Sequence, residues 1–319
     1  MAVRHSTLSV AESAKLTHRA TAASMSVATI LILLKLGAWW ASGSVAMLAS
    51  LADSALDLLA SAATFFAVRY AAAPPDAEHR FGHGKAEAFA SLMQAGLVFA
   101  SAALIGREAI ARIGDSQPLR SELWAMGVML VSVGLTSVLI AIQSSVLKST
   151  GSVAVSGDRA HYAADFASNI VALIGIALAA WLDRPWIDAA AGFLVAAWLV
   201  WGAIGVFREA SLQLMDHELS DEARAQILAL ATEDPRIKGI HQLRTRASGP
   251  VVHMQMHADM DPDLTLVEAH QAMIAAERRL LEAFPSADII IHPDPRGRAE
   301  SHGGPFGERE HDEIESTPS

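Results

Sequence analysis

Long apolar stretches alternate with short charged segments over the first two thirds of the chain. Six of these stretches are long enough to cross a hydrocarbon layer about 30 Å thick, which takes roughly 20 residues of helix. They cover residues 22–40, 44–68, 88–106, 123–147, 161–182 and 186–207. The pattern predicts a transmembrane domain of six helices over residues 20–208. The N-terminal segment, residues 1–19, lacks the features of a removable signal peptide and is expected to stay in the cytoplasm.

A soluble pattern replaces the apolar stretches after residue 208. The expected elements are a helix, two strands joined by a Ser-Gly turn, a second helix and a third strand, at residues 220–235, 237–249, 250–260, 264–284 and 287–293. The order α-β-β-α-β predicts a ferredoxin-like α+β domain over residues 209–294, with both helices on one face of the sheet. Residues 295–319 are rich in charge, Gly, Pro and Ser, and they predict a disordered tail.

Composition supports a membrane protein and excludes some partners. Of 319 residues, 52% are hydrophobic and 18% are charged, and the net charge of −10 argues against nucleic acid as a partner. Cysteine is absent, so a metal site would have to use imidazole and carboxylate ligands. Basic residues concentrate on the side of the membrane that both termini share, which predicts cytoplasmic termini.

Two of the apolar segments carry polar residues one helical turn apart. Asp53 and Asp57 lie on one face of the second segment. His161 and Asp165 repeat this spacing in the fifth segment. An acid in the centre of a membrane helix costs about 2.5 to 3.5 kcal/mol, and neighbouring like charges repel unless a proton or cation lies between them. The four side chains predict a metal site of three carboxylates and one imidazole, which fits zinc, cadmium or iron(II).

Two further groups of His and Asp lie outside the apolar segments. Asp76, His79 and His83 are in a loop rich in proline and glycine, and they predict a second metal site. The third group falls on the strands and second helix of the C-terminal domain, which would bring its members together. It consists of His241, His257, His270, His292 and Asp294. His253 lies on the same strand face as His257 and is either an additional ligand or an exposed residue.

Two other classes of function fit part of the pattern. A magnesium-dependent prenyl transferase of the membrane also has Asp-x-x-x-Asp pairs on helices. It would need basic residues for diphosphate near the acids, and His161 would be an unusual magnesium ligand. A membrane-anchored metal sensor would explain the C-terminal domain but not the polar residues in the apolar segments. A transporter accounts for both features, so an enzyme is not expected.

Several motifs carry a resemblance to a known family. They are GSVAMLASLADSALDLLAS, FGHGKAE, HYAADFASN, GIHQLRTRASGP and IIIHPDP. Over residues 20–294 the chain resembles the cation diffusion facilitator family, and within it the bacterial zinc and ferrous-iron efflux type. The resemblance implies a homodimer in the bacterial inner membrane that exports zinc, cadmium or iron(II) in exchange for protons, by alternating access.

The resemblance also implies roles for individual residues. The membrane, loop and cytoplasmic metal sites of the family fall on the three groups described above, and the cytoplasmic site supports the dimer. A charge interlock at the dimer hinge falls on Lys85 and Asp216. Pro293 stands where relatives often have a glutamine, so the cytoplasmic site would have one ligand fewer. No cofactor is implied beyond the bound divalent metal, with zinc as the first expectation.

Overall fold

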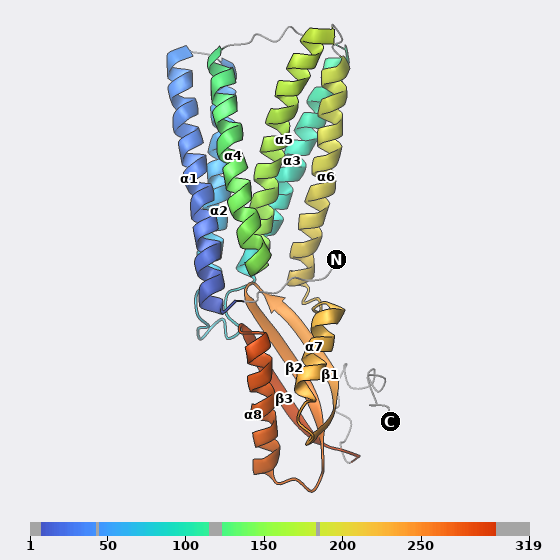
Figure 1. Cartoon of the computed structure of the whole chain (residues 1–319). Coiled ribbons are helices and arrows are strands. Elements are labelled where there is room, and N and C mark those ends of the chain that lie inside the picture. Colours follow the sequence, from blue (N-terminus) through green and yellow to red (C-terminus); the bar gives the residue numbers. More distant parts are fainter. Residues whose placement is uncertain (1–7, 43–44, 115–122, 183–185, 298–319) are drawn as a thin grey trace. The chain divides into compact units, whose positions relative to one another are not determined.

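The chain folds into helices followed by a mixed helix and strand region (Figure 1). The computed structural model describes residues 8–42, 45–114, 123–182 and 186–297. The first six helices are α1 (Val10–Ser42), α2 (Val45–Ala71), α3 (Ala86–Gly114), α4 (Leu123–Thr150), α5 (Val153–Leu182) and α6 (Trp186–Leu214). The remaining elements are α7 (Asp221–Ala231), β1 (Ile237–Ser248), β2 (Val251–Met260), α8 (Leu266–Ala283) and β3 (Ala287–Pro295). This order confirms the predicted fold class.

The elements form two compact units, which are described separately here. The membrane unit is Ala14–Ser211, and the cytoplasmic unit comprises the residues from Leu212 onward together with those before Ala14. The domain boundaries that the sequence predicted, at residues 19, 208 and 294, stay predictions. Most of the predicted tail lies outside the described residues, although β3 reaches Pro295.

Five helices of the membrane unit, α1, α2, α3, α4 and α6, are long and apolar enough to cross a membrane, judged on the described residues alone. Side chains in the second half of α5 lie mostly outside those residues. The helices extend beyond the expected apolar segments. For example, α1 begins at Val10, because its first turns are amphipathic: Glu12 and Lys15 are exposed while Ser13 and Thr17 are buried.

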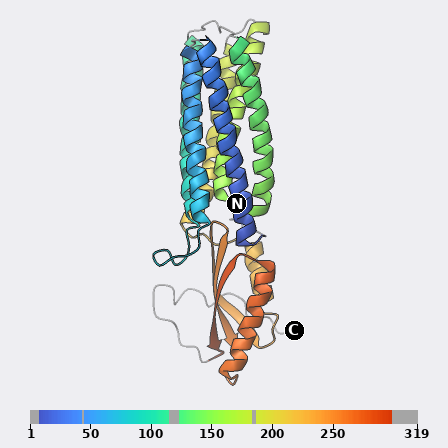
Figure 2. The same ribbon diagram turned by 90° about the vertical axis from the view of Figure 1, so that its left-hand side faces the viewer.

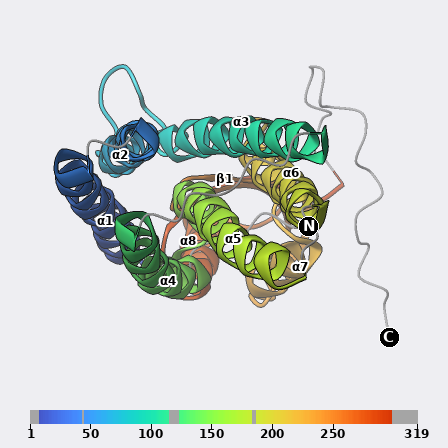
Figure 3. The same cartoon turned by 90° about the horizontal axis from the view of Figure 1, so that it is seen from above.

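Helix α5 packs against α2, α3 and α4, and Figure 3 shows its place in the bundle seen from above. Small residues permit the close approach that helices in lipid require. At Gly157 of α5, an added Cβ would lie 3.0 Å from Ser91 Cα and 3.2 Å from Gln94 Cβ of α3. The glycine is therefore needed for the α3–α5 contact. Ala164 of α5 is buried in the same interface.

A buried carboxylate joins α5 to three other helices. Asp158 is only 1% exposed and accepts hydrogen bonds from Gln143 Nε2 of α4 at 2.8 Å and Gln94 Nε2 of α3 at 3.2 Å. The hydroxyl of Ser24 in α1 donates a third hydrogen bond. Because apolar side chains gain little by leaving lipid for another helix, such polar contacts contribute to helix association in a membrane.

Tyr162, one turn after Asp158, adds α2 to this set. Its hydroxyl donates to the backbone carbonyl of Ser24 at 3.1 Å and lies 2.7 Å from Ser61 Oγ of α2. We call Ser24, Ser61, Gln94, Gln143, Asp158 and Tyr162 the Asp158 network. The network connects five helices through polar groups directly beside His161, and it therefore fixes the part of α5 that carries the candidate metal ligands.

The cytoplasmic unit is a three-stranded sheet in the order β1-β2-β3, covered on one face by α7 and α8. Figure 2 shows α8 against the sheet. Strands β1 and β2 are antiparallel, whereas β2 and β3 are parallel. Met254, Met256 and Leu280 are fully buried between the sheet and the helices. Thr265 and Glu268 form a capping box that starts α8. The opposite face of the sheet is left for polar side chains.

Candidate metal centres

The first candidate centre lies in the membrane unit between α2 and α5. His161 of α5 is 4% exposed, and its Nε2 lies 3.1 Å from Asp57 Oδ1 of α2 and 3.7 Å from Asp165 Oδ2 of α5. One ligand atom from each residue can be chosen so that all three lie within 4.8 Å of one another. An imidazole nitrogen facing two carboxylates can share a proton with them, or all three groups can bind one divalent cation.

The geometry around His161 also fixes how the imidazole is held. Its Nδ1 is buried and has no hydrogen-bond partner among the described residues. The orientation of the ring therefore depends on the two carboxylates at Nε2 and on packing against Tyr162, whose ring centroid lies 5.6 Å away. The two residues follow one another on α5, so the Asp158 network positions the imidazole indirectly.

Asp53, the fourth predicted ligand of this site, lies outside the group. It is on α2 one turn before Asp57, and its side chain is exposed. His161 of α5 meets α2 at Asp57, so a shared face of α2 does not by itself bring Asp53 to the same point. Its role as a ligand stays a prediction.

Two charged residues near this centre, Lys35 and Asp158, were not among the candidate residues selected by their spacing in the sequence. Lys35 interrupts the apolar segment LILLKLG of α1, and Asp158 lies one turn before His161 on α5. Lys35 Nζ donates to Ser54 Oγ at 2.6 Å and to the Ser50 carbonyl at 3.2 Å, both in α2. A charge within an apolar segment was the feature that could have identified Lys35, and a position one helical turn before His161 was the feature that could have identified Asp158.

The second candidate centre is the loop between α2 and α3, where Asp76, His79 and His83 come together. The two carboxylate oxygens of Asp76 lie 3.3 Å from His79 Nδ1 and 3.3 Å from His83 Nε2. His83 Nδ1 lies 3.4 Å from the Ala73 carbonyl and can donate to it, which leaves the lone pair of Nε2 to bind a metal ion beside Asp76. A backbone hydrogen bond from His79 lowers the pKa of Asp76 and keeps the carboxylate ionised.

The third candidate centre lies on the open face of the sheet around Asp294, which is 4% exposed. Asp294 Oδ2 is 2.8 Å from His257 Nδ1 and 3.2 Å from His241 Nε2, while Oδ1 is 3.2 Å from His292 Nε2. Burial lowers the pKa of His257, although its contact with Asp294 opposes this effect. A neutral imidazole beside a shared carboxylate is the state that a metal ion requires.

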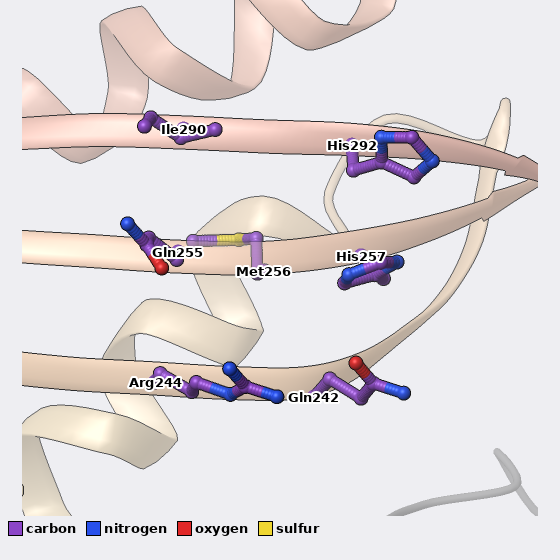
Figure 4. A pocket seen from close by; sticks show the side chains of 7 residues that line it. All are labelled: Gln242, Arg244, Gln255, Met256, His257, Ile290 and His292. Atoms are coloured by element: carbon purple, nitrogen blue, oxygen red, sulfur yellow. The ribbon is translucent and has the colours of Figure 1, made fainter. Parts of the chain in front are cut away.

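Strand pairing explains why these residues meet. His257 of β2 pairs with His241 of β1 and with His292 of β3, so the three side chains form a row across the sheet. A bulge between His241 and Arg244 places Gln242 at φ 52° and bends β1 at this row. Figure 4 shows His257 and His292 side by side in a pocket of about 220 Å³.

Two histidines of the cytoplasmic unit lie apart from this centre. His270 is exposed on α8, whose buried side carries Ala269, Ala272 and Ala276 against the sheet. Its role as a ligand stays a prediction. His253 is 7% exposed, and its Nδ1 lies 3.0 Å from Asp288 Oδ2. The alternative that His253 is exposed is therefore wrong, and its role as an additional ligand stays a prediction.

The predicted charge interlock joins residues of the two units and stays a prediction. Lys85 belongs to the membrane unit and Asp216 to the cytoplasmic unit. Within its own unit, Asp216 accepts a hydrogen bond from Arg246 Nη1 at 3.2 Å. This contact holds the carboxylate at the first turn after α6.

Comparison with known families accounts for nearly the whole described chain. Residues 21–215 match the family described as the cation efflux transmembrane domain, and residues 219–296 match the cytoplasmic domain of the cation efflux protein. The two matches meet close to the boundary between the two compact units.

Individual relatives agree with these matches. The chain is 37% identical over 281 residues to a cation-efflux pump FieF from Cronobacter sakazakii, covering 88% of this chain and 93% of the relative. It is 38% identical over 282 residues to FieF from Yersinia enterocolitica, covering 88% and 94%. A solved structure titled as the zinc form of CzrB is 33% identical over 27% of this chain and 99% of its own, with a TM-score of 0.25.

Proposed function

The chain belongs to the cation diffusion facilitator family of divalent metal transporters, and we propose that it exports zinc from the bacterial cytoplasm in exchange for protons. The observation that carries the proposal is the convergence of Asp57, His161 and Asp165 between two membrane helices. No enzyme activity is needed to explain this group, since it combines a metal-ligand set with groups that also bind protons.

Competition between metal and protons supplies the coupling. Ligation requires a neutral imidazole and ionised carboxylates, so a cation that enters the site displaces a proton from His161 or from one of the acids. Where the site opens to a more acidic solution, protons compete for the same atoms and release the metal. An inward proton gradient therefore drives outward movement of the cation.

Alternating access requires that the ligands face each side of the membrane in turn. The ligands come from two helices, with Asp57 on α2 and His161 and Asp165 on α5. A movement of α2 relative to α5 would open the site to one side of the membrane without unfolding either helix. With both termini in the cytoplasm, as the basic residues predict, metal enters from the cytoplasmic side of the membrane.

The ligand atoms favour zinc and are also compatible with cadmium and iron(II). Carboxylate and imidazole ligands in a tetrahedral site fit zinc, and cadmium and iron(II) bind similar sets. Three ligands meet in the described structure, so a fourth position is open to Asp53 or to water.

The cytoplasmic unit acts as the dimer clamp in this proposal. Bound metal at His241, His257 and Asp294 would offset the acidic charge of the chain, whose net value is −10. Two copies can then approach through this unit. The matched description of a cytoplasmic domain of cation efflux proteins supports a shared role for it across the family.

Zinc flux into proteoliposomes tests the proposal. Purified full-length protein is reconstituted with a zinc-sensitive dye inside, zinc is added outside, and the pH gradient is set in either direction. We expect faster zinc uptake when the lumen is acidic, because protons leaving the vesicle exchange for entering zinc. Reversing the gradient slows the uptake.

Two variants make the experiment specific. Asp57→Asn removes one carboxylate of the group and is expected to abolish flux, while Asp263→Asn makes the same acid-to-amide change on an exposed loop and leaves flux intact. Flux that ignores the gradient would contradict exchange with protons. Equal flux in both variants would contradict the placement of the transport site.

A further inference from the structure

A lysine inside an apolar helix is bonded to the neighbouring helix α2. Lys35 lies within the span of α1, seven residues before the helix ends at Ser42. A lysine near a helix end usually extends its side chain to the membrane surface. Here the ammonium instead donates to Ser54 Oγ at 2.6 Å and to the Ser50 carbonyl at 3.2 Å. The lysine therefore points across to α2.

The partners of Lys35 place its charge beside the candidate metal ligands. Ser54 follows Asp53 directly and lies one turn before Asp57. The ammonium interacts electrostatically with Asp57, Asp165 and Asp53. A fixed positive charge thus lies within range of every carboxylate assigned to the membrane site, while its hydrogen bonds go to other atoms.

The charges of these groups match a divalent cation. The carboxylates of Asp53, Asp57 and Asp165 and the ammonium of Lys35 have a net charge of −2 when His161 is neutral, the form that binds metal. A divalent cation brings the total to zero, which is favourable in a low-dielectric membrane interior. Without Lys35 the occupied site would keep one uncompensated negative charge, and it would hold the cation more tightly.

We propose that Lys35 is a specificity-determining residue of the membrane site, a tethered ammonium that matches the site to a divalent cation and weakens binding enough to permit release. The proposal rests on the proposed transport function. It differs from a purely structural role, in which Lys35 only joins α1 to α2 through Ser54, because the charge role predicts a gain in affinity when the ammonium is removed.

Three substitutions separate charge from hydrogen bonding. Lys35→Gln can keep a hydrogen bond to Ser54 without the charge, Lys35→Met removes both, and Lys35→Arg keeps the charge. Lys15→Met is the matched control, because Lys15 lies on the same helix and is exposed. All four are made in full-length protein that also carries His83→Ala and His257→Ala, so that zinc binding reports on the membrane site.

Zinc affinity and zinc flux are then measured for each variant. We expect Lys35→Gln and Lys35→Met to bind zinc at least about tenfold more tightly, since removal of a nearby like charge strengthens cation binding. The half-saturating zinc concentration for flux should fall together with the maximal rate, because release becomes slower. Lys35→Arg and Lys15→Met should match the parent protein.

Unchanged or weaker zinc binding in Lys35→Gln would overturn the proposal. A loss in Lys35→Met that Lys35→Gln restores would assign Lys35 the structural role instead. If Lys35→Met does not fold, as judged by its elution in detergent, Lys35→Gln alone decides. The binding measurement does not depend on transport, so absence of flux in the parent protein would contradict the proposed function while leaving this test valid.

Discussion

The membrane centre and the cytoplasmic centre use the same residue types in different surroundings. In the membrane unit, one imidazole, His161, faces two carboxylates from two helices. In the cytoplasmic unit, one carboxylate, Asp294, faces three imidazoles from three strands. The ratio of acid to imidazole is therefore inverted between the two centres.

The difference bears on what each centre can do. Strands β1, β2 and β3 are joined by backbone hydrogen bonds, so the row of histidines keeps a fixed spacing. Helices α2 and α5 are joined by side chains, including the Ser61–Tyr162 contact, and can shift without breaking backbone bonds. A site divided between movable helices suits a transported ion, whereas a site on one sheet suits an ion that stays bound.

The largest expected effect separates the two centres directly. His161→Ala removes the central ligand of the membrane site and should reduce zinc flux roughly 100-fold or more. Substitution of residues that only support a metal ligand usually costs less than this. His257→Ala should retain measurable flux while it weakens zinc binding to the cytoplasmic unit. His217→Ala, an exposed histidine outside the clusters, serves as control. Comparable losses of flux in His161→Ala and His257→Ala would remove the distinction.

The Asp158 network provides the next test. Asp158→Ala removes one acceptor each from the buried amides of Gln94 and Gln143, which keep their contacts with Thr64 and Ser24, and should destabilise the membrane unit by about 2 kcal/mol. Thermal unfolding in detergent, followed by tryptophan fluorescence, measures the change. Ser26→Ala is the control, since Ser26 is exposed and bonds only within α1. An unfolding temperature equal to that of the parent would show that the network does not hold the helices.

Helix packing around α5 can be tested with a pair of glycines. Gly157→Ala would place a Cβ 3.0 Å from the Ser91 backbone, so α3 and α5 must separate, at a cost of about 1 to 3 kcal/mol. Gly96→Ala on α3 adds a methyl group where no atom lies within 4 Å, and it should be tolerated. The same unfolding measurement compares the two. Equal stability in both variants would contradict the close α3–α5 contact.

The smallest expected effect concerns the stability of the cytoplasmic unit away from its metal centre. The side chain of Arg236 donates to Asp234 and lowers its pKa to about 2. Since the unfolded value is roughly 3.9, this stabilisation is complete above that pH and is lost as the pH falls towards 2. Asp234→Asn should lower stability by about 1 kcal/mol at neutral pH, after allowing for solvent screening.

Hydrogen exchange of the α7 and β1 amides in the full-length protein measures this change. The difference between Asp234→Asn and the parent should shrink as the pH is lowered from 5 towards about 3, since the carboxylate of the unfolded chain then binds protons while the folded carboxylate, with its lower pKa, stays largely ionised. Zinc binding should stay the same. A difference independent of pH would mean that the carboxylate charge does not stabilise the unit.

The fold was predictable from the sequence because the hydrophobic pattern differs between segments surrounded by lipid and segments surrounded by water. Apolar segments of membrane length gave the six helices, and alternation gave strands such as β2. Helix ends were less predictable, since α1 continues past its apolar segment as an amphipathic helix starting at Val10. The hydrophobic pattern indicates which part of a helix contacts lipid, but it does not indicate where the backbone hydrogen bonds of that helix begin and end.

The candidate sites were predictable where spacing and geometry coincide. The i, i+4 spacing of His161 and Asp165 brings both into one group, whereas the same spacing leaves Asp53 apart from Asp57. The position of α5 beside one turn of α2 decides this, and it depends on tertiary packing such as the Gly157 contact. Asp158 and Lys35 were missed because their partners are hydroxyls and amides on other helices, which no sequence spacing connects.

Simultaneous recording of zinc and proton movement tests the central claim most directly. Proteoliposomes contain a zinc dye and a pH dye, no gradient is imposed, and zinc is added outside. Exchange at the Asp57, His161 and Asp165 site predicts that the lumen becomes alkaline as zinc enters, and that Asp57→Asn abolishes both signals. Zinc entry without a change in luminal pH, or both signals persisting in Asp57→Asn, would contradict it.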